Sequence, residues 1–226
     1  MLLAIFFTGE RSNTIKILLG SLIFLLFIDN YSVKKKLITI LIFFAILITI
    51  IINSDYLGNR YVGQIVKYFN SKDVIAKSFK QNDYILNYKS GYSVFKNYPL
   101  FGVGNKNYRV EACDGSNLTH HGHFKNHYKC TTHPHQIYFE LLSEHGLIGT
   151  ILILGVFFYI IFKIFKEILR TKNYIQIGSF IYVLVNFIPI LPSGSFFNDF
   201  GLTLFWINFS IMFACNKKTN IFTFKN

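Results

Sequence analysis

LITILIFFAILITIII, residues 37–52, is an unbroken apolar run that contains no charged side chain. Lys34, Lys35 and Lys36 directly precede the run, and Asn53 follows it. A helix needs about 20 mainly apolar residues to cross a hydrocarbon core of roughly 30 Å. The run therefore predicts a transmembrane helix and a protein that folds in a bilayer.

Further apolar runs recur along the chain. Residues 15–28 become long enough to span if residues 2–7 join them through the polar residues 8–13, and residues 147–162, 174–191 and 202–214 complete the set. The composition agrees, because 52% of the residues are hydrophobic and 18% are aromatic. The sequence predicts an all-α integral membrane protein with about five transmembrane helices. Its N-terminus lacks the features of a secretory signal, so we expect the spans themselves to insert the chain.

The placement of the charges says more than the net charge of +12, because the short loops carry three basic clusters, and this placement argues against nucleic acid as a partner. The clusters are Lys34 to Lys36, then Lys163 to Lys172, then Lys217 and Lys218. The positive-inside rule makes all three cytoplasmic. We therefore expect two transmembrane helices with an arginine-bearing polar island in residues 1–53, a periplasmic loop in residues 54–144, and three transmembrane helices with a short cytoplasmic tail in residues 145–226.

The outer segment is itself basic, with 11 Lys or Arg and 5 Asp or Glu between Asn53 and His135. This excess suggests an anionic ligand at the outer face, and a solvated loop is the alternative. In an oxidising periplasm, Cys113 and Cys130 are expected to form a disulfide. By closing the ring of residues from Cys113 to Cys130, this disulfide would stabilise the fold by roughly 3 kcal/mol. Cys215 is interpreted as a packing residue.

The segment from Cys130 to Gly149 carries the clearest chemical pattern. Apolar residues at helical spacing follow Pro134, which predicts a helix with Pro134 at its first position and His135 in its first turn. The positive end of a helix disfavours imidazolium and attracts phosphate, so a neutral His135 could accept a proton beside a phosphate leaving group. A structural histidine at a helix start is the alternative.

Two other segments are candidates for a site. The stretch from Asn97 to Arg109 contains a proline and paired glycines, which predict a turn whose backbone approaches something closely. An ordinary surface turn is the alternative. The polar island from Thr8 to Asn13 carries Arg11, whose planar guanidinium suits phosphate. It could equally lie at the membrane interface.

Several histidines in the outer segment suggest a metal site at first sight. However, neither an HExxH motif nor paired CxxC motifs accompany them, so we predict structural or ionic roles and no metal. These residues are His120, His121, His123, His127 and His133.

These segments together resemble the C-terminal portion of the O-antigen ligase and polymerase superfamily. His135-Gln136, nine residues and then Gly146-Leu147-Ile148-Gly149 are similar to the His-[Asn/Ser/Gln]-x9-Gly-x-x-[Gly/Thr/Tyr] signature of the ligases. Pro99-Leu100-Phe101-Gly102-Val103-Gly104 resembles the element upstream of it. Thr8 to Ser12 resembles the arginine-bearing helix that precedes the large periplasmic loop.

The resemblance implies a C-type glycosyltransferase-like fold in the bacterial inner membrane, multi-pass, with its active face periplasmic. It implies a reaction without metal or cofactor that moves an O-antigen-type glycan from undecaprenyl pyrophosphate to an acceptor hydroxyl. The acceptor is lipid A-core in a ligase and the growing glycan in a polymerase. An inactive fragment or a scaffold that binds lipid-linked glycan is the other reading, because family members usually have more membrane helices and an N-terminal membrane half would be missing here.

The resemblance also implies roles for individual residues. His135 would be the general base, Arg11 and Arg109 would bind the donor pyrophosphate, and Gln136 and Glu140 would orient His135. The supporting glycines of the two motifs are Gly102, Gly104, Gly146 and Gly149.

Overall fold

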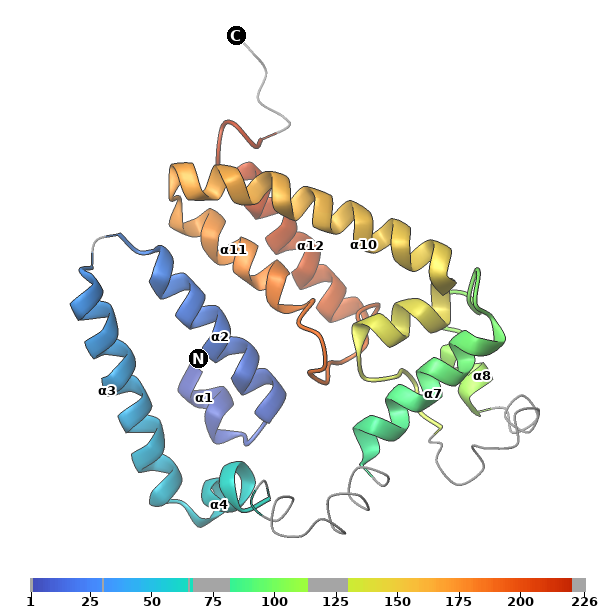
Figure 1. The fold of residues 1–226 in the computed structure, drawn as a ribbon, viewed down its shortest axis with the longest axis horizontal. Coiled ribbons are helices and arrows are strands. Elements are labelled where there is room, and N and C mark those ends of the chain that lie inside the picture. The colour runs from blue at the N-terminus through green and yellow to red at the C-terminus, as the bar shows by residue number, and fades with distance from the viewer. Residues whose placement is uncertain (1, 30, 65, 67–81, 114–129, 221–226) are drawn as a thin grey trace.

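The computed structural model describes residues 2–29, 31–64, 66, 82–113 and 130–220. Within these ranges the regular elements are all helical, and no strand occurs (Figure 1). They are α1 (Leu2–Phe7), α2 (Arg11–Phe27), α3 (Val33–Ile52), α4 (Asp55–Gly58), the π-helix η1 (Asn59–Gly63), α7 (Asp83–Asn97), α8 (Tyr108–Cys113), α10 (Ile137–Thr171), α11 (Tyr174–Val185) and α12 (Asp199–Ala214).

Long helices run side by side through most of the molecule. In Figure 1, α11 lies between α2 and α12, while α3 forms the outer flank of α2. The main core lies where α10, α11 and α12 meet and is rich in aromatic side chains, among them the buried Phe180 and Phe205. The short helices α7 and α8 pack against the first turns of α10, at one end of the long helices.

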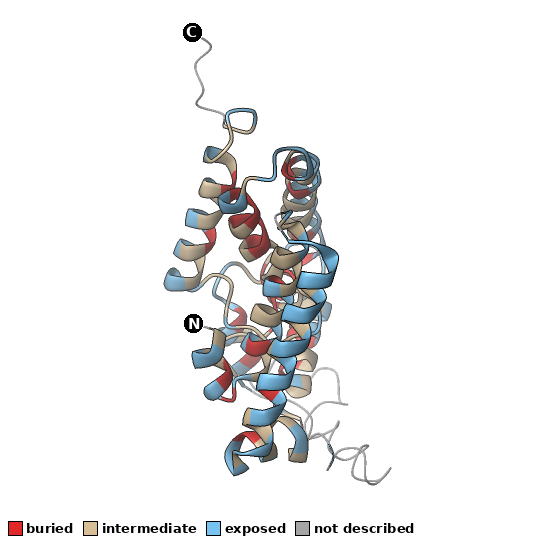
Figure 2. Cartoon of the chain, turned by 90° about the vertical axis from the view of Figure 1, so that its left-hand side faces the viewer, coloured by how far each residue is buried: buried red, intermediate tan, exposed pale blue. Residues whose placement is uncertain are grey.

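In the described part of the chain, two helices are long and apolar enough to cross a membrane, namely α3 and α10, and the most apolar stretch of each has a mean hydropathy of 2.5. In α3 the only fully buried side chain among those described is Leu47, while Leu41, Ile42 and Ile48 are more than half exposed. Figure 2 shows the side of the molecule that carries α3, where exposed residues predominate. An apolar helix with so little cover is compatible with a lipid environment rather than water.

The span predicted by joining residues 2–7 to residues 15–28 is wrong, because the chain turns between α1 and α2. Gly9 has φ +71°, which no helix continues through. Tyr56 Oη donates to the carbonyl of Thr8 at 3.1 Å, and Arg60 Nε donates to that of Gly9 at 3.1 Å. These side chains hydrogen-bond the carbonyls that the turn leaves without helical partners.

The last two predicted spans have different bounds in the structure. The helix expected over residues 174–191 ends at Val185, and α12 begins at Asp199, capped by the side chain of Asn198. The residues from Asn186 to Asn198 form a connecting segment that contains Pro189 and Pro192. The prolines therefore lie within a loop instead of ending the helix directly.

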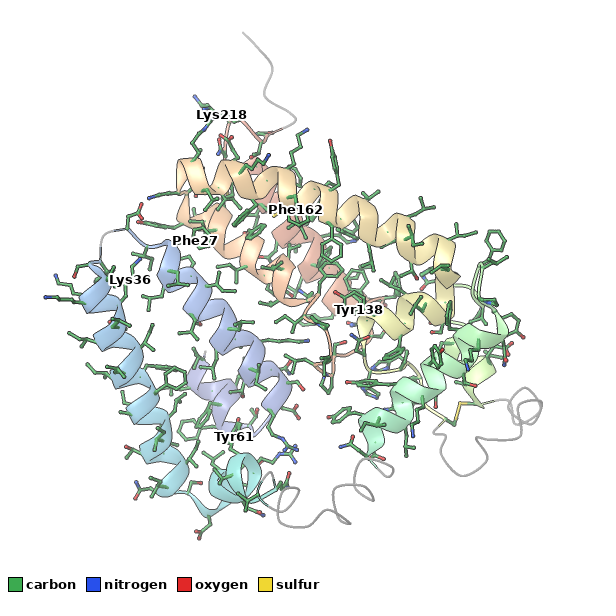
Figure 3. All side chains as sticks on the ribbon, in the orientation of Figure 1. Phe27, Lys36, Tyr61, Tyr138, Phe162 and Lys218 are labelled. Atoms are coloured by element: carbon green, nitrogen blue, oxygen red, sulfur yellow. A yellow bond between two sulfur atoms is a disulfide. The ribbon has the colours of Figure 1, made fainter. Side chains whose placement is uncertain are left out.

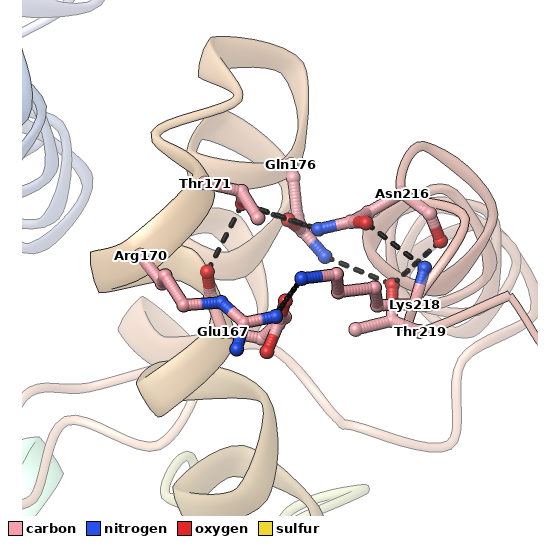
Figure 4. A network of polar contacts seen from close by, with 7 residues as sticks. All are labelled: Glu167, Arg170, Thr171, Gln176, Asn216, Lys218 and Thr219. Carbon is pink, nitrogen blue, oxygen red and sulfur yellow. Dashed lines mark hydrogen bonds and ion pairs between the residues drawn. The ribbon is translucent and has the colours of Figure 1, made fainter.

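The lysine-rich helix ends gather toward one end of the molecule, as the labels of Lys36 and Lys218 show in Figure 3. There, Lys172 forms an ion pair with Asp29, which joins the end of α10 to the end of α2. Figure 4 shows the adjoining polar network, in which Asn216 Nδ2 donates to Thr171 Oγ1 at 3.1 Å. The segments with the family-like motifs lie at the opposite end of the long helices.

Candidate functional site

The Pro99–Gly104 segment and the start of α10 are joined backbone to backbone. α10 is broken at Gly146, where φ is +63° and ψ is −170°, so two helical pieces meet there. The segment crosses this break and exchanges hydrogen bonds with both pieces. Val103 N donates to Ser143 O at 3.0 Å, and Gly104 N donates to Glu144 O at 2.8 Å. In the other direction, Leu147 N donates to Pro99 O at 2.8 Å, and Ile148 N donates to Leu100 O at 3.2 Å.

Two glycines make this close approach possible. A Cβ on Gly146 would lie 2.4 Å from the carbonyl carbon of Leu100, and a Cβ on Gly102 would lie 2.4 Å from that of Glu144. Both glycines also have positive φ, a conformation that side-chain-bearing residues rarely adopt. The turn predicted to approach something closely therefore approaches the broken helix, and the two motifs form one structural unit.

His135 lies outside the helix, contrary to the prediction that Pro134 starts it. The helix begins at Ile137 because the side chain of Gln136 caps it, accepting from Tyr138 N at 2.8 Å and from Phe139 N at 3.1 Å. His135 itself has φ +56°, in the left-handed region. The expectation that His135 feels the helix dipole from the first turn is therefore wrong in its geometry.

The ring of His135 has two aromatic neighbours. Its centroid is 4.0 Å from that of His133 and 6.1 Å from that of Tyr84, on α7. Burial of the His133 ring, reinforced by nearby His135 and opposed by the backbone of Ser193, lowers the pKa of His133 to about 4. His133 is therefore uncharged at neutral pH and places no positive charge against His135.

Contacts to the backbone hold the His135 loop in place. The carbonyl of His135 accepts from Ser193 N at 2.8 Å. Pro134 is buried beside Gly91 of α7, where an added Cβ would lie 2.8 Å from the proline ring. The unusual backbone of His135 is thus fixed from two sides, by α7 and by the segment that precedes α12.

The side chain of Glu140 forms hydrogen bonds with the segment before α12. Its buried carboxylate accepts from Ser195 Oγ and, at 2.8 Å, from Phe196 N. This segment also carries Ser193, whose N–H binds the carbonyl of His135. Any effect of Glu140 on His135 therefore passes through residues 193–196, whereas Gln136 adjoins His135 directly in the chain.

The two arginines proposed for phosphate binding lie on separate elements. Arg11 is half-buried in the first turn of α2, and Arg109 is exposed on α8. Among the described residues, no ion pair joins Glu10 to Arg11, and Glu10 does not cap α2 with its side chain. The carboxylate of Glu10 therefore does not neutralise Arg11 through an ion pair.

A cavity of about 780 Å³ lies between α2, α11 and the segment that leads into α12. Ile137 and Ser193 line it, so it adjoins the His135 loop, but neither Arg11 nor Arg109 is among its lining residues. The cation that does line it is Lys16. Sequence reasoning missed Lys16, although a single charge inside the apolar run of residues 15–28 was the available signal.

Cys113 and Cys130, for which the sequence predicts a disulfide, are bonded, with their Cα atoms 4.7 Å apart. Within the part of the chain that is described, no group of three or more His, Cys, Asp or Glu side chains is placed to hold a metal ion. Of the clustered histidines, His120, His121, His123 and His127 fall outside the described residues.

Comparison with known proteins bears on the same segments. The O-antigen ligase family model matches residues 1–154, which include the polar island, the Pro99–Gly104 segment, His135 and the first part of α10. No curated protein and no solved structure matched the chain. Because the match covers well over half of the 226 residues, this chain belongs to the O-antigen ligase family.

Proposed function

We propose that this chain transfers an O-antigen-type glycan from undecaprenyl pyrophosphate to an acceptor hydroxyl, with His135 as the general base. Family membership indicates glycan transfer of the O-antigen ligase or polymerase type in a bacterial membrane. The observation that carries the assignment to His135 is structural. Ser193 N donates to the carbonyl of His135, and this bond holds the His135 loop beside a cavity that Ile137 and Ser193 line.

The proposed reaction is a displacement at the anomeric carbon of the glycan. His135 takes the proton of the acceptor hydroxyl while its oxygen forms the new glycosidic bond, and the bond to the pyrophosphate breaks. Undecaprenyl pyrophosphate leaves, and its charge is stabilised by Arg11 and Arg109. The position of Arg11 in the first turn of α2 supports this role, because a cation at the start of a helix is unfavourable unless an anion binds there.

The proposed topology has five transmembrane helices, α2, α3, α10, α11 and α12. The lysine-rich end is cytoplasmic, and residues 54–144 form the periplasmic part that carries the site. What supports this orientation is the gathering of the basic helix ends at one end of the molecule, away from the His135 loop. The active face is then periplasmic, in the inner membrane.

We propose lipid A-core as the acceptor, which makes the protein a ligase. A polymerase would use the same chemistry with the growing glycan as acceptor, and a scaffold would bind lipid-linked glycan without transfer. The experiment expresses the wild type and His135→Ala in cells that lack their own ligase and polymerase, and analyses extracted glycolipids. Glycan on lipid A-core identifies a ligase, and lengthened lipid-linked glycan identifies a polymerase.

We expect His135→Ala to lower either product by at least about 100-fold, since only the base is removed. Lys34→Gln, an exposed change at the other end of the molecule, is the control and should retain product. Both variants should reach the membrane with their Cys113–Cys130 disulfide intact. Wild-type product levels in His135→Ala would overturn the assignment of the base.

A further inference from the structure

One face of α2 carries a cation into the cavity between α2 and α11. The α2 side chains that line the cavity recur at three- and four-residue spacing, so they form a continuous stripe. They include Asn13, Lys16, Ile17, Gly20, Ser21 and Leu25. Arg11 lies outside this stripe, so Lys16 is the charged residue of α2 that lines the cavity.

The cavity has both polar and apolar walls. Its polar lining includes Asn13, Asn198 and Ser193. Its apolar lining includes Leu25, about 13 Å from Lys16 along the axis of α2, and Ile181 of α11. A ligand that fits both parts has a polar head and a long apolar tail.

Among the described residues, no carboxylate pairs with Lys16. The described residues that line the cavity include no Asp or Glu. The lysine is half-buried within an otherwise apolar helical run. A charge in such a place is costly unless it is paired, so the cavity favours an anion at this point.

We propose that Lys16 binds the phosphate of a polyprenyl phosphate lipid whose chain occupies the apolar part of the cavity. This inference rests on the proposed function, because it assigns the donor lipid of that reaction a further phosphate-binding cation, Lys16, beside the Arg11 and Arg109 proposed above. It makes Lys16 the residue by which the site distinguishes a phosphorylated polyprenyl lipid from the uncharged alcohol. The phosphate then lies in the cavity that Ile137 and Ser193 also line, and Ser193 N donates to the carbonyl of His135.

The test measures binding to the full chain in nanodiscs of zwitterionic lipid. The probes are undecaprenyl phosphate, undecaprenol and inorganic pyrophosphate. We expect the wild type to bind undecaprenyl phosphate at least 10-fold more tightly than undecaprenol, a difference of about 1.4 kcal/mol. It should bind inorganic pyrophosphate weakly, because pyrophosphate lacks the apolar tail. Lys16→Gln should abolish the preference for the phosphate, Lys16→Arg should keep it, and Lys34→Gln should leave it unchanged.

A second measurement needs no variant. Undecaprenyl phosphate with a photoreactive group next to the phosphate should label residues 13–21 or 193–198 of the wild type. Labelling only of other segments would overturn the proposal, as would cross-links between two copies of the chain through Asn13 and Ser21 in place of lipid adducts. So would an unchanged phosphate preference in Lys16→Gln.

The two hypotheses fail in different ways. If the wild type transfers glycan but Lys16→Gln binds undecaprenyl phosphate as the wild type does, the assignment of Lys16 fails and the transferase function stands. If Lys16 governs phosphate binding but no glycan is transferred, the lipid site stands and the proposed function fails.

Discussion

Single residues decide how the site is built, and Gly146 is the clearest case. The helix break there lets the amides of Leu147 and Ile148 turn to the carbonyls of Pro99 and Leu100. A methyl group at Gly146 would occupy the space of that backbone. The requirement for glycine at this position therefore follows from packing between two segments far apart in the sequence.

Gly146→Ala should lower the free energy of unfolding by about 3 kcal/mol or more, because it combines a positive φ with a backbone clash. Gly155→Ala is the matched control, since α10 leaves open space around that Cβ. The control should be neutral or stabilising by up to about 1 kcal/mol. Thermal unfolding in detergent measures both changes, and equal melting temperatures for the two variants would contradict the backbone contact.

His133 should make the loop before α10 sensitive to acid. Its pKa is about 4 in the folded protein and about 6.5 when unfolded, so between these values the unfolded state binds more protons. Stability from His133 is therefore complete above about pH 6.5 and is lost as the pH falls toward 4.

Hydrogen exchange of residues 131–136, corrected for its intrinsic pH dependence, measures this effect. Between pH 7 and pH 5 the wild type should lose more protection than His133→Gln, which cannot titrate. The same loss of protection in both proteins would show that His133 is not the group responsible.

At the scale of elements, the segment between α11 and α12 is held by side chains from two other helices. Tyr88 of α7 donates to the carbonyl of Ile190 at 3.0 Å, and Glu140 of α10 accepts from Ser195 and Phe196. This segment forms one wall of the cavity and supports the His135 loop. The site is thus assembled from α7, α10 and the approach to α12.

Glu140→Ala should destabilise that segment by about 3 kcal/mol, because it removes two hydrogen bonds to a buried carboxyl group. Asp55→Ala, which removes an exposed carboxylate, is the control and should cost about 1 kcal/mol or less. Chemical unfolding in detergent gives both values, and limited proteolysis should show earlier cleavage near residues 193–198 only in Glu140→Ala. Equal proteolysis of the two variants would argue against this role.

Sequence patterns predicted the long helices well but not the contacts that shape the site. The apolar run of residues 37–52 lies wholly within α3, because its pattern depends on local hydrophobicity alone. The break at Gly146 depends on hydrogen bonds to Pro99 and Leu100, which no local pattern contains. The position of His135 was mispredicted for a related reason, since Gln136 competes with Pro134 to start the helix. Lys16 was visible in the sequence, but its significance depends on the cavity.

At the scale of the whole molecule, the lysine-rich helix ends and the family-like motifs lie at opposite ends of the long helices. The ion pair of Lys172 with Asp29 belongs to the basic end, and the disulfide and the His135 loop belong to the other. This separation is what the proposed orientation needs, with a disulfide in an oxidising compartment and lysines in the cytoplasm.

Single cysteines introduced into a Cys215→Ser background test that orientation in intact cells. A membrane-impermeant thiol reagent should label Asn105→Cys without permeabilisation, and should label Lys218→Cys only after permeabilisation. The reverse pattern would contradict the topology. Tyr98→Cys, at the end of α7, is a second outer position that should follow Asn105→Cys.

The central claim is that His135 removes the proton of the acceptor hydroxyl. The most direct test is single-turnover transfer by the purified chain in nanodiscs, from undecaprenyl-pyrophosphate-linked glycan to lipid A-core at pH 7. The account predicts that His135→Ala binds the donor as the wild type does and transfers glycan at least about 100-fold more slowly. Transfer at the wild-type rate by His135→Ala would contradict it.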